Sequence, residues 1–265
     1  GRGEIEILGV TCVTSNPHAP GCVDAVDRWY GRPEIPVGTL KEPGFLEKSD
    51  YSEHIAKTWP NRYKEGVAAV PDATALFRRV VAAQPDESVV LVSIGPLRNL
   101  RRFLESAPDA ASALGGRDLV AKKVKVLSCM ACVFRPVNPW GKGALKVEWN
   151  IEQDVPSAKA VFAGWPTDVM VSGFEIGWPL HADQGLVDAF PQSPVAWGLK
   201  KQGGGRPAWD QTSLLYAARG LGEYWEAAAV TFLFTFGDYL EALTIEKTRS
   251  SIKALLATAP DSARV

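Results

Sequence analysis

The six residues Val-Val-Leu-Val-Ser-Ile at positions 89–94 constrain the fold more than any other segment. A nearly continuous apolar run of this length is typical of a parallel β-strand that is covered on both faces. Residues 72–83 precede it with apolar side chains at helical spacing, and Gly95-Pro96 follows it as a turn signal. A buried strand between helical segments predicts an α/β protein with a parallel sheet.

Similar units recur along the chain. We predict strands at residues 4–13, 34–38, 89–94, 124–133 and 167–176. We predict helices at residues 20–31, 72–83, 100–104, 119–121, 156–164, 208–219 and 244–257. Residues 41–63 show no clear period and are interpreted as a long loop with one helical turn, of the kind that forms lids, and residues 230–236 as a β-rich segment. No repeat or linker is visible, so we expect a single domain over residues 1–265, an α/β fold with an open, mostly parallel sheet and helices on both faces.

Composition excludes several classes of protein. The chain has 265 residues, of which 46% are apolar, enough for a sizeable core. The 29 basic and 30 acidic residues give a net charge of -1 without a polybasic run, so we expect no nucleic-acid partner. No apolar stretch is long enough to cross a membrane, and no signal peptide is visible, so we expect a cytoplasmic protein without a membrane partner.

The four cysteines are too few for a disulfide scaffold in a chain of this length. Cys129 and Cys132 have redox or zinc spacing, but they lie on a predicted strand, where positions i and i+3 point to opposite faces. No second pair completes a tetrahedral zinc site. We interpret these two residues, with Cys12 and Cys22, as structural thiols.

Glu148 and Asn150 form the first of three polar clusters, which lie where predicted strands end or helices begin. In open α/β sheets the ligand binds at the carboxyl ends of the strands. Because the two residues are two positions apart, an extended segment would point both side chains to one face and Trp149 to the other. Such a pair suits the neighbouring hydroxyls of a sugar, and the alternative is the solvent-facing edge of a strand.

Asn16 and Asp210 belong to the other two clusters. Asn16 ends the first predicted strand, where it either presents its amide to a ligand or belongs to an ordinary Asn-Pro turn. Asp210 follows Trp209 at the start of a predicted helix, where it is either a ligand or only a helix N-cap.

The histidines do not join these clusters. His18, His54 and His181 are interpreted as surface residues, with His54 in the predicted lid the best placed of the three. A serine hydrolase is disfavoured because the chain has no G-x-S-x-G elbow. The glycines at 203–205 lack the ending of a phosphate loop and are interpreted as a flexible loop.

The clusters resemble the motifs of the nucleoside hydrolases, the inosine–uridine-preferring N-ribohydrolase family. Glu148-Trp149-Asn150 is similar to the family's E-F-N, in which Glu and Asn bind ribose, and residues 154–158 are similar to its D-P-E-A-A. Residues 95–100 are similar to G-P-L-T-N-L, and the residue before that motif, here Ile94, lends its backbone carbonyl to calcium.

Three further positions follow from the same resemblance. Asn16 corresponds to a ligand-contacting Asn of the family, and Asp210 to an Asp that ligates calcium. Trp209 stands where several members carry a His that protonates the leaving base. A tryptophan cannot act as that acid, although it can stack on a base and so bind substrate.

The resemblance implies hydrolysis of the N-glycosidic bond of ribonucleosides to ribose and base, in purine or pyrimidine salvage. It implies calcium as cofactor, a small-molecule nucleoside as partner, and a possible homo-oligomer. The family opens with an aspartate cluster, roughly D-x-D-x-G-x-D-D, and this sequence begins just after the place where that cluster belongs. We therefore expect an N-terminally truncated domain with an incomplete calcium site, impaired activity, and a general base outside this sequence. The alternative function is a non-catalytic sugar- or nucleoside-binding module on the same fold, and a hydrolase of another glycosyl bond is a third.

Overall fold

The computed structural model describes residues 4–49, 51–64, 66–135, 137–138, 145, 147–181 and 184–220. It divides the chain into the units Gly1–Ala218 and Arg219–Val265, and the core and the candidate site both lie in the first. The predicted β-rich segment at 230–236 and the predicted helix at 244–257 lie outside the described residues. A single domain over residues 1–265 stays a prediction.

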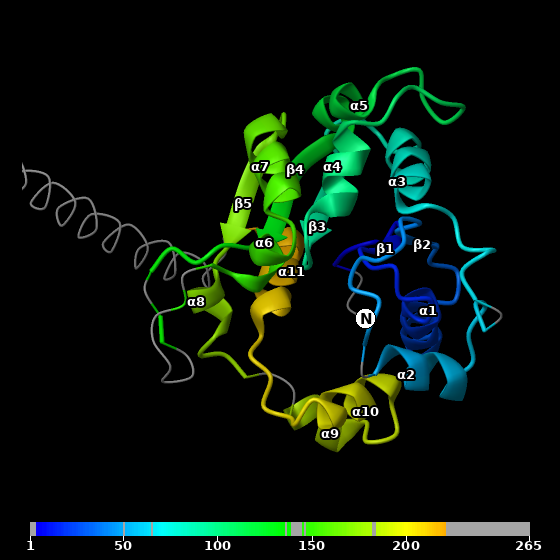
Figure 1. Cartoon of the computed structure of the whole chain (residues 1–265), viewed down its shortest axis with the longest axis vertical. Coiled ribbons are helices and arrows are strands. Elements are labelled where there is room, and N and C mark those ends of the chain that lie inside the picture. The colour runs from blue at the N-terminus through cyan, green and yellow to red at the C-terminus, as the bar shows by residue number, and fades with distance from the viewer. Residues whose placement is uncertain are drawn as a thin grey trace, which may run out of the picture. The chain divides into compact units, whose positions relative to one another are not determined.

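The strands of the described residues form two parallel sheets (Figure 1). They are β1 (Val10–Cys12), β2 (Val37–Thr39), β3 (Val89–Ser93), β4 (Val124–Met130) and β5 (Asp168–Ser172). The first sheet pairs β1 with β2, and the second has the order β3-β4-β5. The α/β class and the parallel pairing are confirmed, while the predicted strands are divided between two sheets.

Helices connect the strands, as parallel pairing requires. They are α1 (Ala19–Trp29), α2 (Ser52–Thr58), α3 (Ala73–Ala82), α4 (Arg98–Leu104), α5 (Gly116–Lys123), α6 (Trp149–Gln153), α7 (Val155–Gly164), α8 (Phe174–Gly177), α9 (Gln184–Ala189), α10 (Pro194–Lys201) and α11 (Trp209–Arg219). None of these helices combines the length and the apolar character needed to span a bilayer.

The main apolar core lies between the second sheet and helices α3, α4, α5 and α7. Leu127 and Cys129 of β4 point into it, and Phe103 of α4 and Val161 of α7 meet them from the helical layer; each is fully buried. Burying a side chain of this kind contributes about 1.5–3 kcal/mol to folding. The apolar run at residues 89–94 therefore forms a strand of this core, β3, as predicted.

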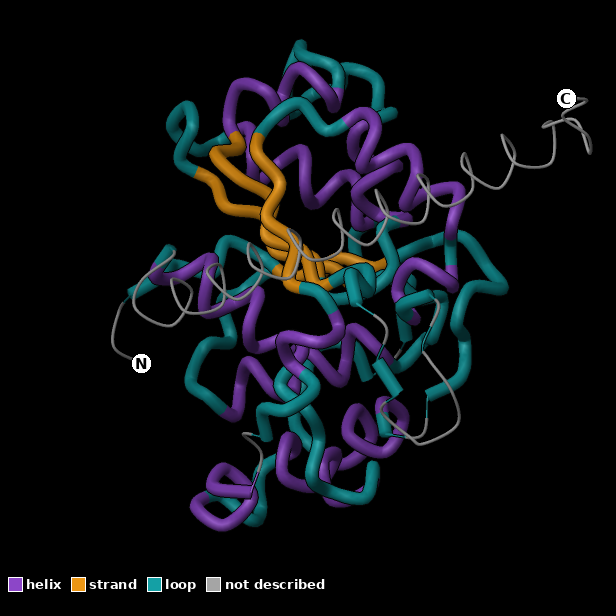
Figure 2. The backbone as a smooth tube through the Cα atoms, turned by 90° about the vertical axis from the view of Figure 1, so that its left-hand side faces the viewer, coloured by secondary structure: helices purple, strands orange, loops and turns teal. Residues whose placement is uncertain are grey.

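The opposite face of the second sheet carries buried serines, which pack on α11. Ser128 Oγ of β4 donates to the backbone carbonyl of Ser213 at 2.8 Å. Ser172 Oγ of β5 lies 2.6 Å from Thr212 Oγ1. Because both serines are completely buried, these bonds avoid the cost of unsatisfied hydroxyl groups. Helices thus cover both faces of this sheet, as predicted, and Figure 2 shows the strands flanked by helices on both sides.

Hydrogen bonds of Asp24 and Arg62 connect α1 and the first sheet to the segment after α2. The Asp24 carboxylate is fully buried and accepts hydrogen bonds from Arg28 Nε at 2.8 Å and from Arg62 N and Nε at 2.7 Å each. Arg62 Nη2 also donates to the carbonyl of Ile35, just before β2, at 2.7 Å. The predicted lid region is therefore anchored to α1 at its far end.

The carboxyl ends of β1 and β3 lie side by side although they belong to different sheets. Asn99 Nδ2 of α4 donates to the carbonyl of Cys12, the last residue of β1, at 3.1 Å. A Cβ atom at Gly95 would lie 3.0 Å from Cγ1 of Val13, so a larger residue would crowd this approach. The Gly95-Pro96 turn therefore ends β3 and also allows close packing against Val13.

Several predicted boundaries in the first third of the chain are wrong. The predicted strand 4–13 pairs only at Val10–Cys12, because its partner β2 is equally short, and Ile5 and Ile7 remain 44% and 39% exposed. The strand predicted at 34–38 forms at Val37–Thr39, since Pro36 has no N–H for the ladder. Residues 41–63 contain a seven-residue helix, α2, where one turn was expected.

Two later strands end earlier than predicted. β4 ends at Met130 because Cys132 adopts φ +67°, a left-handed conformation that cannot continue a strand. β5 ends at Ser172, and the rest of the predicted strand 167–176 becomes α8. Helices α9 and α10 were not predicted. The glycines at 203–205 all have positive φ, between +61° and +90°, as expected for the loop.

Candidate functional site

Glu148 lies beyond β4 with its side chain turned inward. It is 3% exposed and is the N-cap of α6. Its Oε1 accepts the N–H of Asn150 at 2.8 Å and its Oε2 the N–H of Ile151 at 3.2 Å. The left-handed turn at Cys132 supplies a third backbone N–H to the carboxylate. Burial raises the pKa of Glu148 above its usual value, the three N–H groups lower it, and the charge of Asp210 raises it further.

Asn150 shares the buried side with Glu148, but not for the predicted reason. The segment is the start of a helix rather than an extended strand, because the Glu148 carboxylate caps it. Asn150 Nδ2 donates to the carbonyl of Met130, at the end of β4, at 3.1 Å. Trp149 is 53% exposed on the other side. A solvent-facing strand edge, the alternative interpretation, does not describe this pair.

Asp210 comes to the same region from α11, in which it occupies the first turn. Burial raises the pKa of Asp210 to about 6, against the opposing charge of Arg206. Burial also raises the pKa of Tyr51, the N-cap of α2, with smaller contributions from Cys22 and from Asp210. Asp210 therefore acts electrostatically on Glu148 and on the start of α2.

Trp209 belongs to an aromatic cluster, which we define as Phe174, Trp178 and Trp209. The Trp209 ring lies 5.0 Å from Phe174 and 5.9 Å from Trp178, centroid to centroid. Trp209 Nε1 donates to the carbonyl of Phe174 at 3.1 Å. A Cβ at Gly177 would fall 2.4 Å from Trp209 Cα, so this glycine is needed for the close packing of α8 on α11. Trp209 is therefore held rigidly beside Asp210.

Asn16 is buried in the turn that follows β1. Its Oδ1 accepts the N–H of His18 at 2.8 Å, so the Asn-Pro turn chemistry considered as an alternative is present. The Asn16 backbone N–H donates to Thr14 Oγ1 at 3.0 Å. The turn thus fixes the Asn16 side chain through its amide oxygen.

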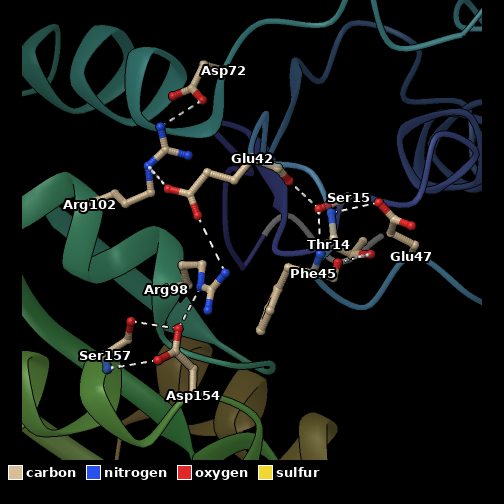
Figure 3. Close-up of polar contacts among 11 residues, drawn as sticks. Thr14, Ser15, Glu42, Phe45, Glu47, Asp72, Arg98, Arg102, Asp154 and Ser157 are labelled. Carbon is tan, nitrogen blue, oxygen red and sulfur yellow. Dashed lines mark hydrogen bonds and ion pairs between the residues drawn. The ribbon is translucent and has the colours of Figure 1, made fainter.

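The turn at Asn16 is itself fastened to residues 42–46. Ser15 N donates to the carbonyl of Phe45 at 2.8 Å, Thr14 Oγ1 donates to the carbonyl of Leu46 at 2.6 Å, and Ser15 Oγ donates to the carbonyl of Glu42 (Figure 3). The start of the predicted lid therefore packs on the strand end that carries Asn16.

Arg98 connects this lid segment to the region beyond Glu148, a link that the sequence did not reveal (Figure 3). Arg98 Nε lies 2.6 Å from Asp154 Oδ2, its Nη1 lies 3.5 Å from Glu42, and its guanidinium carbon lies 3.8 Å from the centroid of the Phe45 ring. Asp154 also accepts Ser157 Oγ at 2.8 Å. Two motif segments, 95–100 and 154–158, thus meet through an ion pair.

Glu175 is a second residue that sequence reasoning missed, because it lies in a segment predicted as strand. Its Oε1 accepts the N–H of Phe134 at 3.0 Å. Its Oε2 is buried and has no hydrogen-bond partner within the described part of the chain. Glu175 sits on α8 next to the aromatic cluster and acts electrostatically on Cys132, which in turn borders Glu148.

Histidines and cysteines are engaged elsewhere. His18 lies 3.9 Å from Glu53, His54 stacks on Trp197 at 3.9 Å, and His181 Nδ1 lies 2.8 Å from the Gly205 carbonyl. The four thiols are free, and burial raises the pKa of Cys129 to about 12 and that of Cys132 to about 11, which makes both unreactive. The prediction of structural cysteines is confirmed.

The predicted site residues therefore occupy neighbouring strand ends. Ile94 is 45% exposed directly after β3, Asn16 follows β1, and the ends of these strands touch through Asn99 and Gly95. Glu148 follows β4, which pairs with β3, and lies within electrostatic reach of Asp210. That they contact one ligand together is a proposal.

Comparison with known proteins agrees with this geometry. The family model described as inosine-uridine preferring nucleoside hydrolase matches residues 1–178. A plant nucleoside hydrolase, the PpNRh1 enzyme, is similar in structure with a TM-score of 0.57 and 17% identity, over 82% of this chain and 71% of that one. The effector protein XOO4466 has a TM-score of 0.56 and 12% identity, over 81% of this chain and 72% of that one.

A third similar structure is the type III effector protein XopQ complexed with adenosine diphosphate ribose, with a TM-score of 0.55 and 13% identity, over 81% of this chain and 73% of that one. At these identities the likeness concerns the fold alone. No protein of curated function matches the sequence.

The described residues do not form a complete site for calcium, the cofactor that the family implies. No group of three or more His, Cys, Asp or Glu side chains converges among them in a way that would hold a metal ion. Calcium takes about six to eight oxygen ligands. The Asp210 carboxylate and the Ile94 carbonyl supply only part of such a set, so the described residues alone would not hold calcium tightly.

Proposed function

Because the chain belongs to the inosine-uridine preferring nucleoside hydrolase family, we propose that it binds a ribonucleoside and hydrolyses its N-glycosidic bond to ribose and free base. The observation that carries the proposal is the buried pair Glu148 and Asn150, fixed at the end of β4 with Asp210 in electrostatic reach. Polar groups held in place before a ligand arrives bind it at a lower entropic cost.

Glu148, Asn150 and Asn16 hold the ribose in this proposal. The Glu148 carboxylate accepts three backbone N–H groups, from Cys132, Asn150 and Ile151, and keeps one lone-pair position for a sugar hydroxyl. Asn150 donates to Met130 and keeps its amide oxygen as an acceptor, while Asn16 keeps its amide nitrogen as a donor. The backbone contacts thus orient the side chains and leave complementary groups for the vicinal hydroxyls.

The reaction forms a bond from a water oxygen to the sugar carbon while the bond to the base nitrogen breaks. The electron pair of the broken bond stays on the base nitrogen, which gains one proton as the water loses one, so that ribose and neutral base result. The transition state resembles an oxocarbenium ion, whose positive charge the carboxylates Glu148 and Asp210 stabilise. A general base removes one proton from the water, and we assign it to no described residue. Asp210 and the Ile94 carbonyl are proposed as two of the oxygens that would hold calcium, and an ion held there would supply Lewis acidity. Trp209 is proposed to stack on the base.

Release of ribose from inosine and uridine by the full chain, with calcium and with chelator, tests this function. Glu148→Gln should lower kcat/KM by at least tenfold, since one lost charge-assisted hydrogen bond is worth about 1.5–3 kcal/mol. Glu152→Gln, which changes an exposed residue of the same helix, is the matched control. Ribose release that Glu148→Gln and Asp210→Asn leave unchanged would contradict the site.

A non-catalytic nucleoside-binding module is the second candidate function. It is favoured by Trp209, which occupies the position of the family's proton donor, and by the engagement of all three histidines away from Glu148 and Asp210. Calorimetry with uridine distinguishes the two, because a module binds the nucleoside without releasing ribose. Self-association and a cytoplasmic location stay predictions.

A further inference from the structure

Residues 131–134 form a turn that continues the pairing of β4 with β5 beyond the ends of both strands. The Ala131 N–H donates to the Ser172 carbonyl at 3.2 Å, and the Cys132 carbonyl accepts the Phe174 N–H at 3.0 Å. Cys132 adopts a left-handed conformation, with φ +67°, which costs free energy in a residue other than glycine. The contacts around the turn must therefore hold it in this form.

Glu175 fixes the far end of this turn. Its Oε1 accepts the Phe134 N–H at 3.0 Å, at a point where β5 has already given way to α8. Gly173 leaves room for the contact, because a Cβ atom there would lie 2.8 Å from both Glu175 Oε2 and Phe134 Cδ2. A carboxylate side chain thus supplies the acceptor that the strand no longer provides.

The Glu175 carboxylate is held in place at a cost. Its Oε2 is buried and has no hydrogen-bond partner within the described part of the chain, and a buried oxygen without a donor destabilises the fold. A glutamine could accept the Phe134 N–H without bringing a negative charge to this position. The charges of Glu175 and Glu148 both act on Cys132, so the two carboxylates lie on either side of the same turn.

The turn connects Glu175 to Glu148. In its left-handed conformation Cys132 gives its carbonyl to Phe174 and its N–H to the Glu148 carboxylate, which also accepts two N–H groups of α6. If the turn relaxed to an ordinary conformation, the Cys132 N–H would no longer point at Glu148. One of the three donors that fix the Glu148 carboxylate would then be lost.

We propose that Glu175 is a positioning residue: by accepting the Phe134 N–H it holds the turn at Cys132, and the turn in turn fixes the Glu148 carboxylate for a ribose hydroxyl. This inference rests on the proposed function, in which Glu148 binds the sugar. Glu175 acts only through Glu148 and has no contact with the substrate.

The first measurement uses the full chain without a ligand. Carbon-13 NMR of protein labelled at its glutamate side chains follows the titration of Glu148, and Glu148→Gln assigns the signal. Glu175→Ala should raise the proton affinity of Glu148 about tenfold, because the carboxylate loses an N–H that favours its charged form. Loss of the Glu175 charge alone would shift the titration in the opposite direction, since a negative neighbour disappears.

Further variants separate the contact from the charge. Glu175→Gln keeps an acceptor for the Phe134 N–H, so the proton affinity of Glu148 should be equal to that of the wild type or lower. Adding Cys132→Gly to Glu175→Ala should restore the Glu175→Gln value, because glycine adopts the left-handed conformation without strain. Glu152→Ala, at an exposed position on α6, is the matched control. If Glu175→Ala does not fold, Glu175→Asp replaces it, since its carboxylate is too short to reach Phe134.

The second measurement is uridine binding by calorimetry. Glu175→Ala should weaken binding about fivefold, because the Glu148 carboxylate is less well fixed, and Glu175→Gln should leave binding near the wild-type value. In a Glu148→Gln background Glu175→Ala should add no further loss, as expected for a residue that acts only through Glu148. General damage to the fold would weaken binding in both backgrounds.

The outcomes distinguish the two proposals. If Glu175→Ala lowers the proton affinity of Glu148 or leaves it unchanged, the positioning role is wrong, and ribose release still decides the hydrolase function. If the proton affinity rises as expected but uridine is neither bound nor cleaved, the positioning role stands and the proposed function fails. Equal losses of uridine binding in the two backgrounds also overturn the positioning role.

Discussion

Two pairs of carboxylates, Asp24 with Asp154 and Glu148 with Asp210, differ in the charged groups that lie near them; Asp210 is half-buried and the other three are buried. Asp24 meets Arg28 and Arg62, and Asp154 meets Arg98 at 2.6 Å. For both, burial raises the pKa but the hydrogen bonds from these arginines outweigh it, so each pKa lies below its usual value. These residues connect helices and loops far from one another in sequence.

Glu148 and Asp210 have no close ion pair of this kind among the described contacts. Backbone N–H groups hold Glu148, and only the charge of Arg206 opposes the effect of burial on Asp210. Burial therefore prevails, and the pKa of each lies above its usual value. Charge without a countercharge lowers stability, and residues kept at such a cost tend to serve ligands. In this chain the countercharge, more than burial, separates the structural carboxylates from the pair that we propose to be functional.

The largest effect should follow from Asp210→Asn, which removes a carboxylate from the functional pair. We expect ribose release to fall by about 100-fold or more, since electrostatic stabilisation of the transition state is worth about 2.7–4 kcal/mol per group. Thermal stability should be unchanged or slightly higher, because a neutral amide is easier to bury. Asp188→Asn, at an exposed position on α9, is the control. A variant that keeps its activity but loses stability would place Asp210 with the structural pair.

Asp24→Asn, in the structural pair, should lower stability rather than activity. We expect a loss of about 2 kcal/mol in the free energy of unfolding, since Arg28 and Arg62 lose their partner but remain partly exposed. The cost should be greatest at neutral pH: the folded pKa of Asp24 is lowered, so its contribution is present above the unfolded pKa and disappears as pH falls through the folded value. Urea denaturation at several pH values measures it. Glu53→Gln, which breaks the exposed pair with Lys57, should leave the free energy of unfolding nearly unchanged.

Arg98→Met removes the ion-pair partner of Asp154, the second carboxylate of the structural pair. We expect a loss of about 1 kcal/mol, because the pair with Asp154 is partly exposed on the arginine side. Arg101→Met, on the same helix, removes only an exposed pair with Glu105 and should leave stability nearly unchanged. Equal losses from the two variants would show that the clamp between α4 and α7 contributes nothing beyond a surface ion pair.

Local signals in the sequence predicted the second sheet well. The apolar run at residues 89–94 and the helical pattern at 72–83 became β3 and α3 almost at the predicted residues, because strand burial and the Asp72 cap are encoded locally. The first sheet was predicted poorly. Its strands are three residues long, and their extent depends on the pairing partner rather than on apolar alternation.

In the candidate site, too, features with a local signal in the sequence were predicted and features that depend on distant contacts were not. Glu148 and Asn150 were predicted as site residues from their spacing together with the family resemblance, but their helical backbone was not predicted, since it follows from a cap contact made by Glu148 itself. Arg98 and Glu175 were missed because their roles depend on Asp154 and on a buried oxygen without a donor, neither of which has a local signal. Pairwise contacts between distant segments determine the function of a charged residue, and a single sequence does not display them.

The smallest effect should come from Asp27→Asn, and it should be a gain. Asp27 is a neighbour of Asp24 on α1 whose buried Oδ2 has no hydrogen-bond partner in the described residues, and burial together with the charge of Asp24 raises its pKa to about 6. A folded pKa above the unfolded value stabilises the fold only while the group is protonated, so this contribution is lost as pH rises from about 4 through 6. The variant should match the wild type near pH 4 and exceed it by about 1 kcal/mol at pH 8, about 2–4 °C in Tm. Asp168→Asn, at the exposed start of β5, is the matched control, and a destabilised Asp27→Asn would mean that the Asp27 carboxylate is paired like Asp24 after all.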